Sequence, residues 1–245
     1  MTLGGVWSMV LTMVNNPKQR PAEESRLRDT TQAVQDYLKV IYKLRQDRPV
    51  PTTAIAERLE LSSAAVSKML KHLAVLGLVE HNRYRGVELT DMGEKIALEV
   101  IRHHRLLELY LVEALGLPWD RVDAEADLLE HVLSEDVEER MAAALGNPTR
   151  DPHGDPIPSP DLSLEDRVRL SLADVPTGSQ ARVLRVPDRD PRLLRYLGEI
   201  GLVPDADVHV LRREPLDGPL HIQVGGAGMQ RVIGRDIAES VSVCQ

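Results

Sequence analysis

The 245-residue sequence predicts a mainly α-helical chain that ends in a small β domain. Three observations predict this fold class. A helix–turn–helix pattern is followed by two strand-like runs, and two long amphipathic helices come next. Beyond a proline-rich segment, the sequence changes to short β-like runs separated by Gly, Pro and Asp. We therefore expect a winged helix-turn-helix, a helical dimerisation domain and a small β-barrel, in that order.

The N-terminal module has the element order of a winged helix-turn-helix. Its predicted elements are a helix at residues 31–45, a short helix at 53–59, a turn at 60–62, a helix at 63–76, and strands at 78–82 and 86–90. In the helix at 63–76, the apolar stripe that should be buried consists of Val66, Met69, Leu70, Leu73 and Leu76. Gly77 should cap this helix, because glycine readily adopts the left-handed conformation that ends helices.

Two long helices are predicted at residues 91–115 and 123–145, each followed closely by glycine and proline. Both are amphipathic and can pair with copies of themselves, so we expect a homodimer. Residues 147–161 hold five prolines and are expected to form an extended linker. The remaining predicted elements are strands at 181–186, 207–212, 220–224 and 241–243 and a helix at 191–200.

These patterns divide the chain into five parts. They are a loosely ordered N-terminal extension, the winged helix-turn-helix, the helical dimerisation domain, a proline-rich linker and the β domain. Their expected bounds are 1–28, 29–92, 93–148, 149–168 and 169–245.

Charge and cysteine content narrow the function classes. Residues 1–92 hold 13 Lys and Arg against 10 Asp and Glu, a net +3, whereas the rest of the chain carries −11. A mildly basic first part and an acidic remainder suggest a division of roles. The single cysteine, Cys244, excludes an intramolecular disulfide framework and fits a reducing compartment. The apolar run at residues 6–14 is too short to span a bilayer, so we expect a cytoplasmic protein with no membrane partner.

The second helix of the winged helix-turn-helix predicts double-stranded DNA as a partner. Short hydroxyls and lysines lie on or near its exposed face, and a basic tip joins the two strands. The residues expected to contact operator DNA are Ser62, Ser63, Ser67, Lys68, Lys71, Arg83, Tyr84 and Arg85. Two alternatives stay open. These can be ordinary surface residues, or the winged helix can serve for protein contacts alone.

A candidate metal site begins with the sequence "DLLEH". On a continuous helix, Asp127, Glu130 and His131 occupy positions i, i+3 and i+4 and share one face. Carboxylates and imidazoles are ordinary ligands of divalent cations. His104 and Glu108 have the same i, i+4 spacing on the preceding helix, and Asp36 on the first helix can face both. A solvated acidic stripe beside a histidine is the alternative.

These residues lie in stretches that resemble the DtxR/MntR family of metal-dependent transcriptional regulators. The matching stretches are "TTQAVQDYLKVIYKL", "AERLELSSAAVSKMLKHLAVLGLVE", "YRGVELTDMGEKIA", "RHHRLLELYLVEALGL", "DAEADLLEHVLSEDVEERM", "DPHGDPIP" and "LRYLGEIGLVPDADVHVLRR". The resemblance covers about residues 29–245. It implies that the β domain is SH3-like (FeoA-type) and that a metal-loaded homodimer represses metal-uptake genes.

The resemblance also implies two metal sites. The main site would consist of Asp36, Asp127, Glu130 and His131, with His104 in or near it. The second would use Glu108 and His153, completed by an acidic residue of the SH3-like domain, for which we take Asp190 with Asp188 as the alternative.

The chain departs from the iron-sensing branch of this family at three positions. That branch has a methionine at the position of Asp36, a cysteine at Asp127 and a histidine at Asp123, and the last difference puts its ancillary site in doubt here. A ligand set of carboxylates and imidazoles suits Mn²⁺, with Fe²⁺ second.

Two other functions stay open at this stage. A dinuclear metallohydrolase could use the same carboxylates and histidines. The sequence supplies no nucleophile or oxyanion motif, so we expect no enzyme activity and no small-molecule substrate. A winged-helix protein with a purely structural metal site would bind DNA equally well after chelation.

Overall fold

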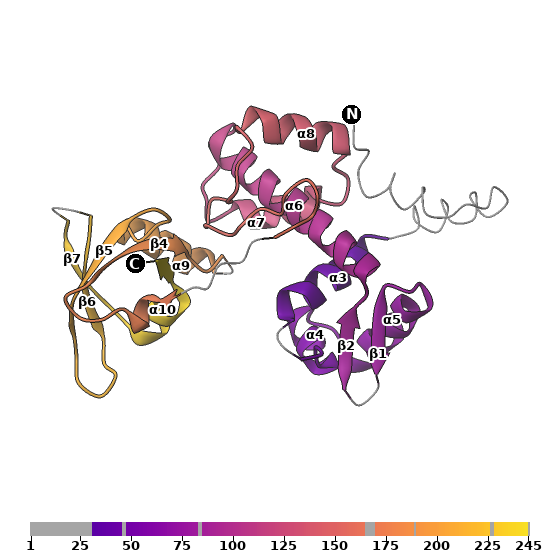
Figure 1. Ribbon diagram of the computed structural model, residues 1–245, viewed down its shortest axis with the longest axis horizontal. Helices are drawn as coiled ribbons and strands as arrows, with labels where there is room; N and C mark the ends of the chain where they lie inside the picture. The colour runs from indigo at the N-terminus through magenta and orange to yellow at the C-terminus, as the bar shows by residue number, and fades with distance from the viewer. Residues whose placement is uncertain are drawn as a thin grey trace. The chain divides into compact units, whose positions relative to one another are not determined.

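The computed structural model describes residues 31–45, 48–82, 85–164, 170–188, 190–225 and 228–244. The chain divides into two compact units. Figure 1 shows the helices and strands of both units with their labels. Among described residues, the first unit contains the chain up to His103 together with Glu130–Glu135 and Pro158–Ser163. The second contains His104–Leu129, Asp136–Ile157 and the C-terminal part from residue 170. No helix in the described part of the chain is long and apolar enough to cross a membrane.

The first unit contains the winged helix-turn-helix. Its elements are α3 (Gln32–Leu44), α4 (Thr52–Arg58), α5 (Ser63–Val75), β1 (Val79–Asn82), β2 (Gly86–Leu89) and the start of α6 (Asp91–Glu113). The two strands pair as an antiparallel hairpin, with α5 packed against β1 and α3 against β2. The predicted order of helix, turn, helix and hairpin is confirmed, with bounds within two residues of those expected.

The core of this module is built from the predicted stripe of α5. Val66, Leu70 and Leu73 are fully buried, and Met69 and Leu76 pack partly buried against the same cluster. Period-3.6 spacing places these side chains on one face, and their burial against α4 and β1 stabilises the module.

Gly77 ends α5 as predicted. Its φ of +73° is left-handed, its N–H donates to Ala74 O, and Leu78 N–H donates to Leu73 O. Two carbonyls of the last turn are thereby satisfied, and the chain reverses directly into β1.

The predicted helix over residues 123–145 is wrong as a single element. Two helices, α7 (Val122–Leu129) and α8 (Glu135–Ala144), replace it, and residues 130–131 form a turn. Two local causes explain the break. The side chains of Glu130 and His131 engage α3, and Glu135 and Asp136 favour a new helix N-terminus through the helix dipole. Asp127 therefore does not share one helical face with Glu130 and His131.

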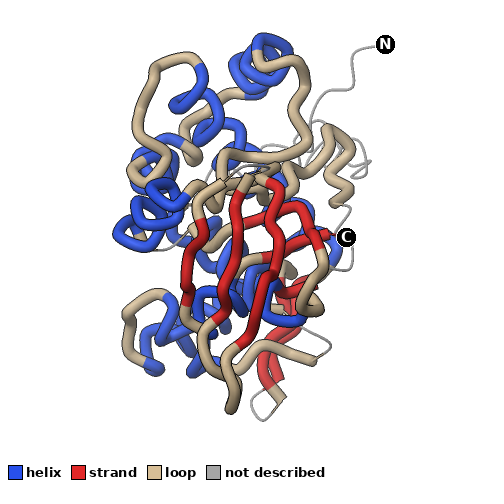
Figure 2. The backbone as a smooth tube through the Cα atoms, turned by 90° about the vertical axis from the view of Figure 1, so that its left-hand side faces the viewer, coloured by secondary structure: helices blue, strands red, loops and turns tan. Residues whose placement is uncertain are grey.

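The C-terminal part is SH3-like. Its elements are β3 (Leu170–Ser171), the 3₁₀ turn η1 (Leu172–Asp174), β4 (Gln180–Arg185), α9 (Pro191–Ile200), β5 (Asp207–Arg213), β6 (Leu220–Val224), β7 (Gln230–Ile233), α10 (Arg235–Ser240) and β8 (Ser242–Cys244). The strands form one antiparallel sheet in the order β3-β8-β4-β5-β6-β7 (Figure 2). The expected barrel is not closed, because β3 and β7 remain the two edges of this sheet within the described residues.

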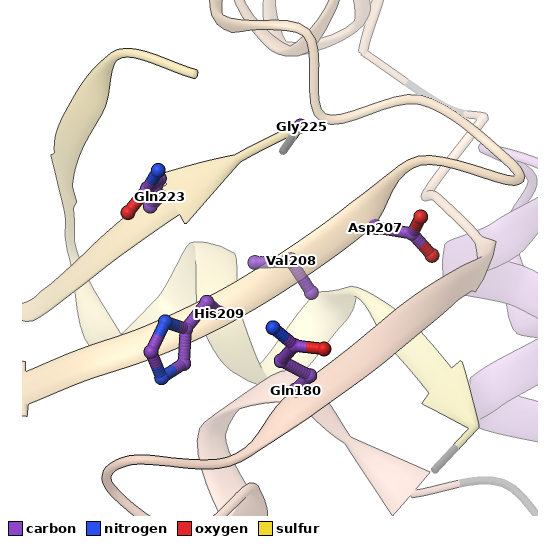
Figure 3. Close-up of a pocket in the computed structure, with 6 residues that line it drawn as sticks. All are labelled: Gln180, Asp207, Val208, His209, Gln223 and Gly225. Carbon is purple, nitrogen blue, oxygen red and sulfur yellow. The ribbon is translucent and has the colours of Figure 1, made fainter. Parts of the chain in front are cut away.

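A depression of about 260 Å³ lies on this sheet (Figure 3). The side chains that line it come mainly from neighbouring strands, and its residues are Gln180, Asp207, Val208, His209, Gln223 and Gly225. Among described residues, its lining belongs to none of the groups with metal-binding geometry.

The segment expected to be an extended linker is folded around residues 151–157. Asp151, His153 and Asp155 are buried. The Asp151 Oδ1 atom accepts hydrogen bonds from the backbone N–H groups of His153 and Asp155, each at 2.9 Å, which curls the proline-rich chain into a tight loop. Val186 N–H donates to His153 O at 2.9 Å, so the loop also contacts the SH3-like part of the same unit.

We predict that Leu70→Ala lowers the free energy of unfolding by about 2–5 kcal/mol, because it leaves a cavity at a fully buried position of α5. Val75 on the same helix is 86% exposed, so Val75→Ala should stay within about 0.5 kcal/mol of the unmodified protein. Urea denaturation of both variants measures the difference. Equal losses would contradict the assignment of the core face.

Candidate metal centre

The first cluster joins α3 to the turn that follows α7. Asp36 lies on α3, and its Oδ1 atom is 3.0 Å from His131 Nε2. The same imidazole nitrogen is 3.4 Å from Glu130 Oε1. Glu130 is 1% exposed and His131 7%, whereas Asp36 is 38% exposed. One imidazole nitrogen and two carboxylates therefore meet within the first unit.

Gln35 sets the direction of the His131 ring. The His131 Nδ1 atom lies 2.6 Å from Gln35 Oε1, which is an acceptor only, so Nδ1 carries the proton and donates it. In the neutral ring Nε2 then holds the lone pair, and this atom faces Asp36 and Glu130. A second hydrogen bond of this kind commonly fixes metal-binding histidines.

His104 of α6 lies among carboxylates of the second unit. Its Nδ1 atom is 3.3 Å from Asp127 Oδ1, and its Nε2 atom is 3.2 Å from Asp123 Oδ1 and 3.6 Å from Glu108 Oε1. His104, Glu108 and Asp123 offer one ligand atom each within 4.8 Å of one another. A carboxylate thus stands where the iron-sensing branch has a histidine.

A further cluster in the second unit is fully buried. Glu108, Asp151 and His153 also offer ligand atoms within 4.8 Å of one another. The His153 Nε2 atom is 2.8 Å from Trp119 O and donates its proton there, so Nδ1 carries the lone pair in the neutral ring. That Nδ1 atom is 3.5 Å from Glu108 Oε1, and neither atom has a hydrogen-bond partner.

Two buried acceptors that face each other without a donor are costly unless a cation lies between them. This cluster therefore fits a divalent cation on the chemistry of its own atoms. The Trp119 ring stacks on His153 with centroids 5.6 Å apart, which further restricts the imidazole.

Asp151 contributes a second carboxyl group to the buried cluster. Burial, the nearby Glu108 carboxylate and then Asp155 raise its pKa well above the ordinary value, while Arg105 opposes the shift. The Arg105 Nε atom is 3.6 Å from Asp151 Oδ2, and its Nη2 atom is 3.0 Å from Asp155 Oδ1. The Arg105 guanidinium thus pairs with the carboxyl groups of both Asp151 and Asp155.

The predicted ligands are only partly brought together. Asp36, Glu130 and His131 meet in one cluster, and Glu108 and His153 meet in another. Asp190 instead caps α9, where its Oδ1 atom accepts from Arg192 N–H at 2.8 Å. Asp188 is half-buried and, among described residues, belongs to no ligand group.

Sequence reasoning missed Asp151 as a member of the buried cluster. The signal that could have found it is its position two residues before His153 in "DPHGDPIP".

The proposed DNA-contacting residues lie on the outer side of the winged helix. Ser63, Lys68, Lys71 and Arg85 are exposed and Ser67 is half-buried. Ser62 is exposed and caps α5, since its hydroxyl accepts from Ala65 N–H at 3.2 Å. Arg83 and Tyr84 lie outside the described residues.

Comparison with known proteins decides the family. Residues 29–87 match a family model described as "Iron dependent repressor, N-terminal DNA binding domain". Residues 90–159 match the model "Iron dependent repressor, metal binding and dimerisation domain", and residues 170–244 match "FeoA domain". The iron-dependent repressor IdeR of Mycobacterium leprae is 39% identical over 198 residues, which cover 75% of this chain and 86% of that protein. The chain belongs to the iron-dependent repressor family.

Other repressors of this family extend the comparison. The diphtheria toxin repressor of Corynebacterium diphtheriae is 33% identical over 229 residues, covering 89% of this chain and 99% of that protein. A solved manganese-dependent transcriptional repressor in complex with manganese is 39% identical, with a TM-score of 0.79 over 86% of this chain and 99% of that one. The repressor ScaR with bound Cd²⁺ is 30% identical, with a TM-score of 0.72 over 86% of this chain and 98% of that one. The iron-dependent repressor family consists of DNA-binding regulators, so the chain is not an enzyme and the hydrolase alternative falls.

We predict that Gly154→Ala disrupts the buried cluster. Gly154 has a φ of +89°, and an added Cβ would lie 1.9 Å from Leu184 O, so the loop of His153 would have to shift. Gly178 is the matched control, because its φ is +85° but nothing lies within 4 Å of an added Cβ. Gly178→Ala should cost about 1 kcal/mol in thermal unfolding and Gly154→Ala clearly more. Equal costs would contradict this close approach.

Proposed function

We propose that the chain is a Mn²⁺-dependent transcriptional repressor, with Fe²⁺ as the second choice, that binds operator DNA as a cytoplasmic homodimer. The observation that carries the proposal is the cluster of Asp36, Glu130 and His131. It connects the first helix of the winged helix-turn-helix to the turn after α7. Metal occupancy can therefore act directly on the DNA-binding module.

The donor set supports Mn²⁺. Both clusters consist of carboxylate oxygens and imidazole nitrogens, and the one cysteine of the chain, Cys244, is exposed in β8. Hard oxygen-rich sites suit Mn²⁺ and Fe²⁺, whereas soft thiolates would favour Cu(I) or Zn²⁺. The solved relative named as a manganese complex and the relatives named as iron-dependent repressors fit these same two ions.

The mechanism follows from where the ligands are attached. When bound, the ion would supply positive charge that attracts both the Asp36 and the Glu130 carboxylates. Leu38 and Ile41 of α3 are buried in the core of the winged helix-turn-helix, so α3 moves with that module as one body. Holding Asp36 against the Glu130–His131 turn would restrict the orientations of the module and raise its apparent affinity for DNA.

A second ion would be held by Glu108, Asp151 and His153, with His104 and Asp123 beside them. His104 and Asp127, the other two residues expected at the main site, contact each other within the second unit. Asp127 precedes the Glu130–His131 turn by three residues and lies 3.3 Å from His104 Nδ1. Asp190 is kept only as a lesser candidate, because its carboxylate already serves α9.

Homodimer formation is supported by exposed apolar side chains around α7 and α8. In the second unit, the large exposed ones of these helices are Leu128, Leu129 and Val137. Exposed apolar patches commonly mark a protein interface. A pair of modules held by such an interface would present two α5 helices to successive major grooves.

The proposal predicts that Asp36→Ala loses the tightening of DNA binding on addition of Mn²⁺, at least about tenfold at a fixed Mn²⁺ concentration. Fluorescence anisotropy with labelled operator DNA, with Mn²⁺ and with a chelator, measures the change. Asp136→Ala is the matched control, because the Asp136 carboxylate is exposed on α8 and pairs there with Arg140. Undiminished Mn²⁺ dependence in Asp36→Ala would overturn the proposal, and equal binding after chelation of the unmodified protein would indicate a structural metal.

The exposed face of α5 gives a separate prediction. Lys68→Ala and Lys71→Ala should each weaken binding to all DNA sequences and lower the slope of log affinity against log salt by about 1, since each removes a phosphate contact. Arg231→Ala in β7 serves as a charge control outside the module. An unchanged salt slope for both lysine variants would show that α5 does not face the DNA backbone.

A further inference from the structure

A buried lysine occupies the main cluster beside the proposed ligands. The Lys39 Nζ atom lies 2.9 Å from Glu130 Oε1 and 2.7 Å from Glu130 Oε2. Their side chains are 9% and 1% exposed. Lysine is almost never buried to this extent without a charged partner, so the pair is a specific feature of the fold.

Lys39 and Asp36 reach the same turn because they stand three residues apart on α3. Lys39 and His131 both contact the Glu130 carboxylate. The ammonium group of Lys39 reaches both of its oxygens, and His131 Nε2 lies 3.4 Å from Oε1 while also facing Asp36. Any cation that uses Glu130 as a ligand shares that carboxylate with Lys39 or displaces it.

We propose that Lys39 is a tethered competitor of the divalent ion at this cluster and sets its affinity. This inference rests on the proposed function, because it concerns the same site. With Lys39 in place, Asp36 and Glu130 present one net negative charge to an incoming ion instead of two. A neighbouring positive charge in a poorly solvated site opposes the binding of a second one.

Competition between Lys39 and the ion would also explain why the fold retains the buried Lys39–Glu130 pair. A regulator has to release its ion when the free concentration falls, so a site of maximal affinity would be permanently occupied. Lys39 lowers the affinity without removing a ligand, and it keeps the buried Glu130 carboxylate paired whenever the ion leaves. The ammonium and the ion thus exchange at one carboxylate.

The test is calorimetric titration of the full chain with Mn²⁺ at constant pH. The binding phase that Asp36→Ala abolishes identifies the ions held at this cluster. Lys39→Met keeps the length of the side chain and removes the charge, and it should bind Mn²⁺ at this phase at least about tenfold more tightly. Its thermal midpoint without Mn²⁺ should fall, because Glu130 then loses the ammonium group that pairs with both of its oxygens. The rise on adding Mn²⁺ should exceed that of the unmodified protein.

Three further variants make the result decisive. Lys39→Gln keeps a hydrogen-bond donor toward Glu130 without the charge and replaces Lys39→Met if that variant does not fold. Lys39→Arg keeps the charge and should not gain affinity. Lys95→Met removes a charge from an exposed position of α6 and should leave the affinity unchanged.

The outcomes separate this inference from the proposed function. Unchanged or weaker Mn²⁺ binding in the neutral variants, with the Asp36-dependent phase intact in the unmodified protein, overturns the role of Lys39 and leaves the proposed function standing. Absence of any Asp36-dependent phase in the unmodified protein overturns both.

Discussion

The metal-binding part of this structure depends on one constraint: buried carboxylates that lie close together need positively charged partners. Glu108, Asp151 and Glu130 are all buried, and each lies beside a histidine in a group with metal-binding geometry. Burial of this much negative charge is unfavourable unless it is paired. The structure pairs these carboxylates in two ways. Near Asp151 a guanidinium is shared between two carboxylates, and at Glu130 an ammonium is inserted.

The two clusters differ in which charged group pairs with the carboxylates and in what surrounds the histidine. In the main cluster the histidine has two acidic neighbours, and one of them, Asp36, is partly solvated. In the buried cluster the lone pair of His153 and an oxygen of Glu108 face each other unsatisfied. The first arrangement allows an ion to enter and leave from solvent. The second resembles a structural site, in which the ion would hold the loop of His153 to α6.

Much of the winged helix-turn-helix could be predicted because local rules agree there. The apolar spacing of α5, the glycine after it and the hairpin pattern all specify the same fold, and tertiary contacts do not override them. The error at residues 130–131 has the opposite origin. Helical periodicity continues through them in the sequence, but contacts with α3, almost a hundred positions away, end the helix.

The candidate site was harder to predict for the same reason. Residue types and spacing pointed to Asp36, Glu130 and His131, but the roles of Gln35 and Lys39 depend on three-dimensional proximity alone. The proline-rich segment was wrongly predicted to be extended, because its composition is that of a linker. Its compactness comes from one carboxylate that accepts two backbone hydrogen bonds, which no composition reveals.

The stacking of Trp119 on His153 has a practical consequence. Indole emission responds to the charge of an adjacent imidazole and to ions that quench by contact. The chain has only one other tryptophan, Trp7. Replacing Trp7 would leave a single intrinsic fluorophore whose backbone carbonyl and ring both contact the histidine, so unlabelled protein could report optically on filling of the buried cluster.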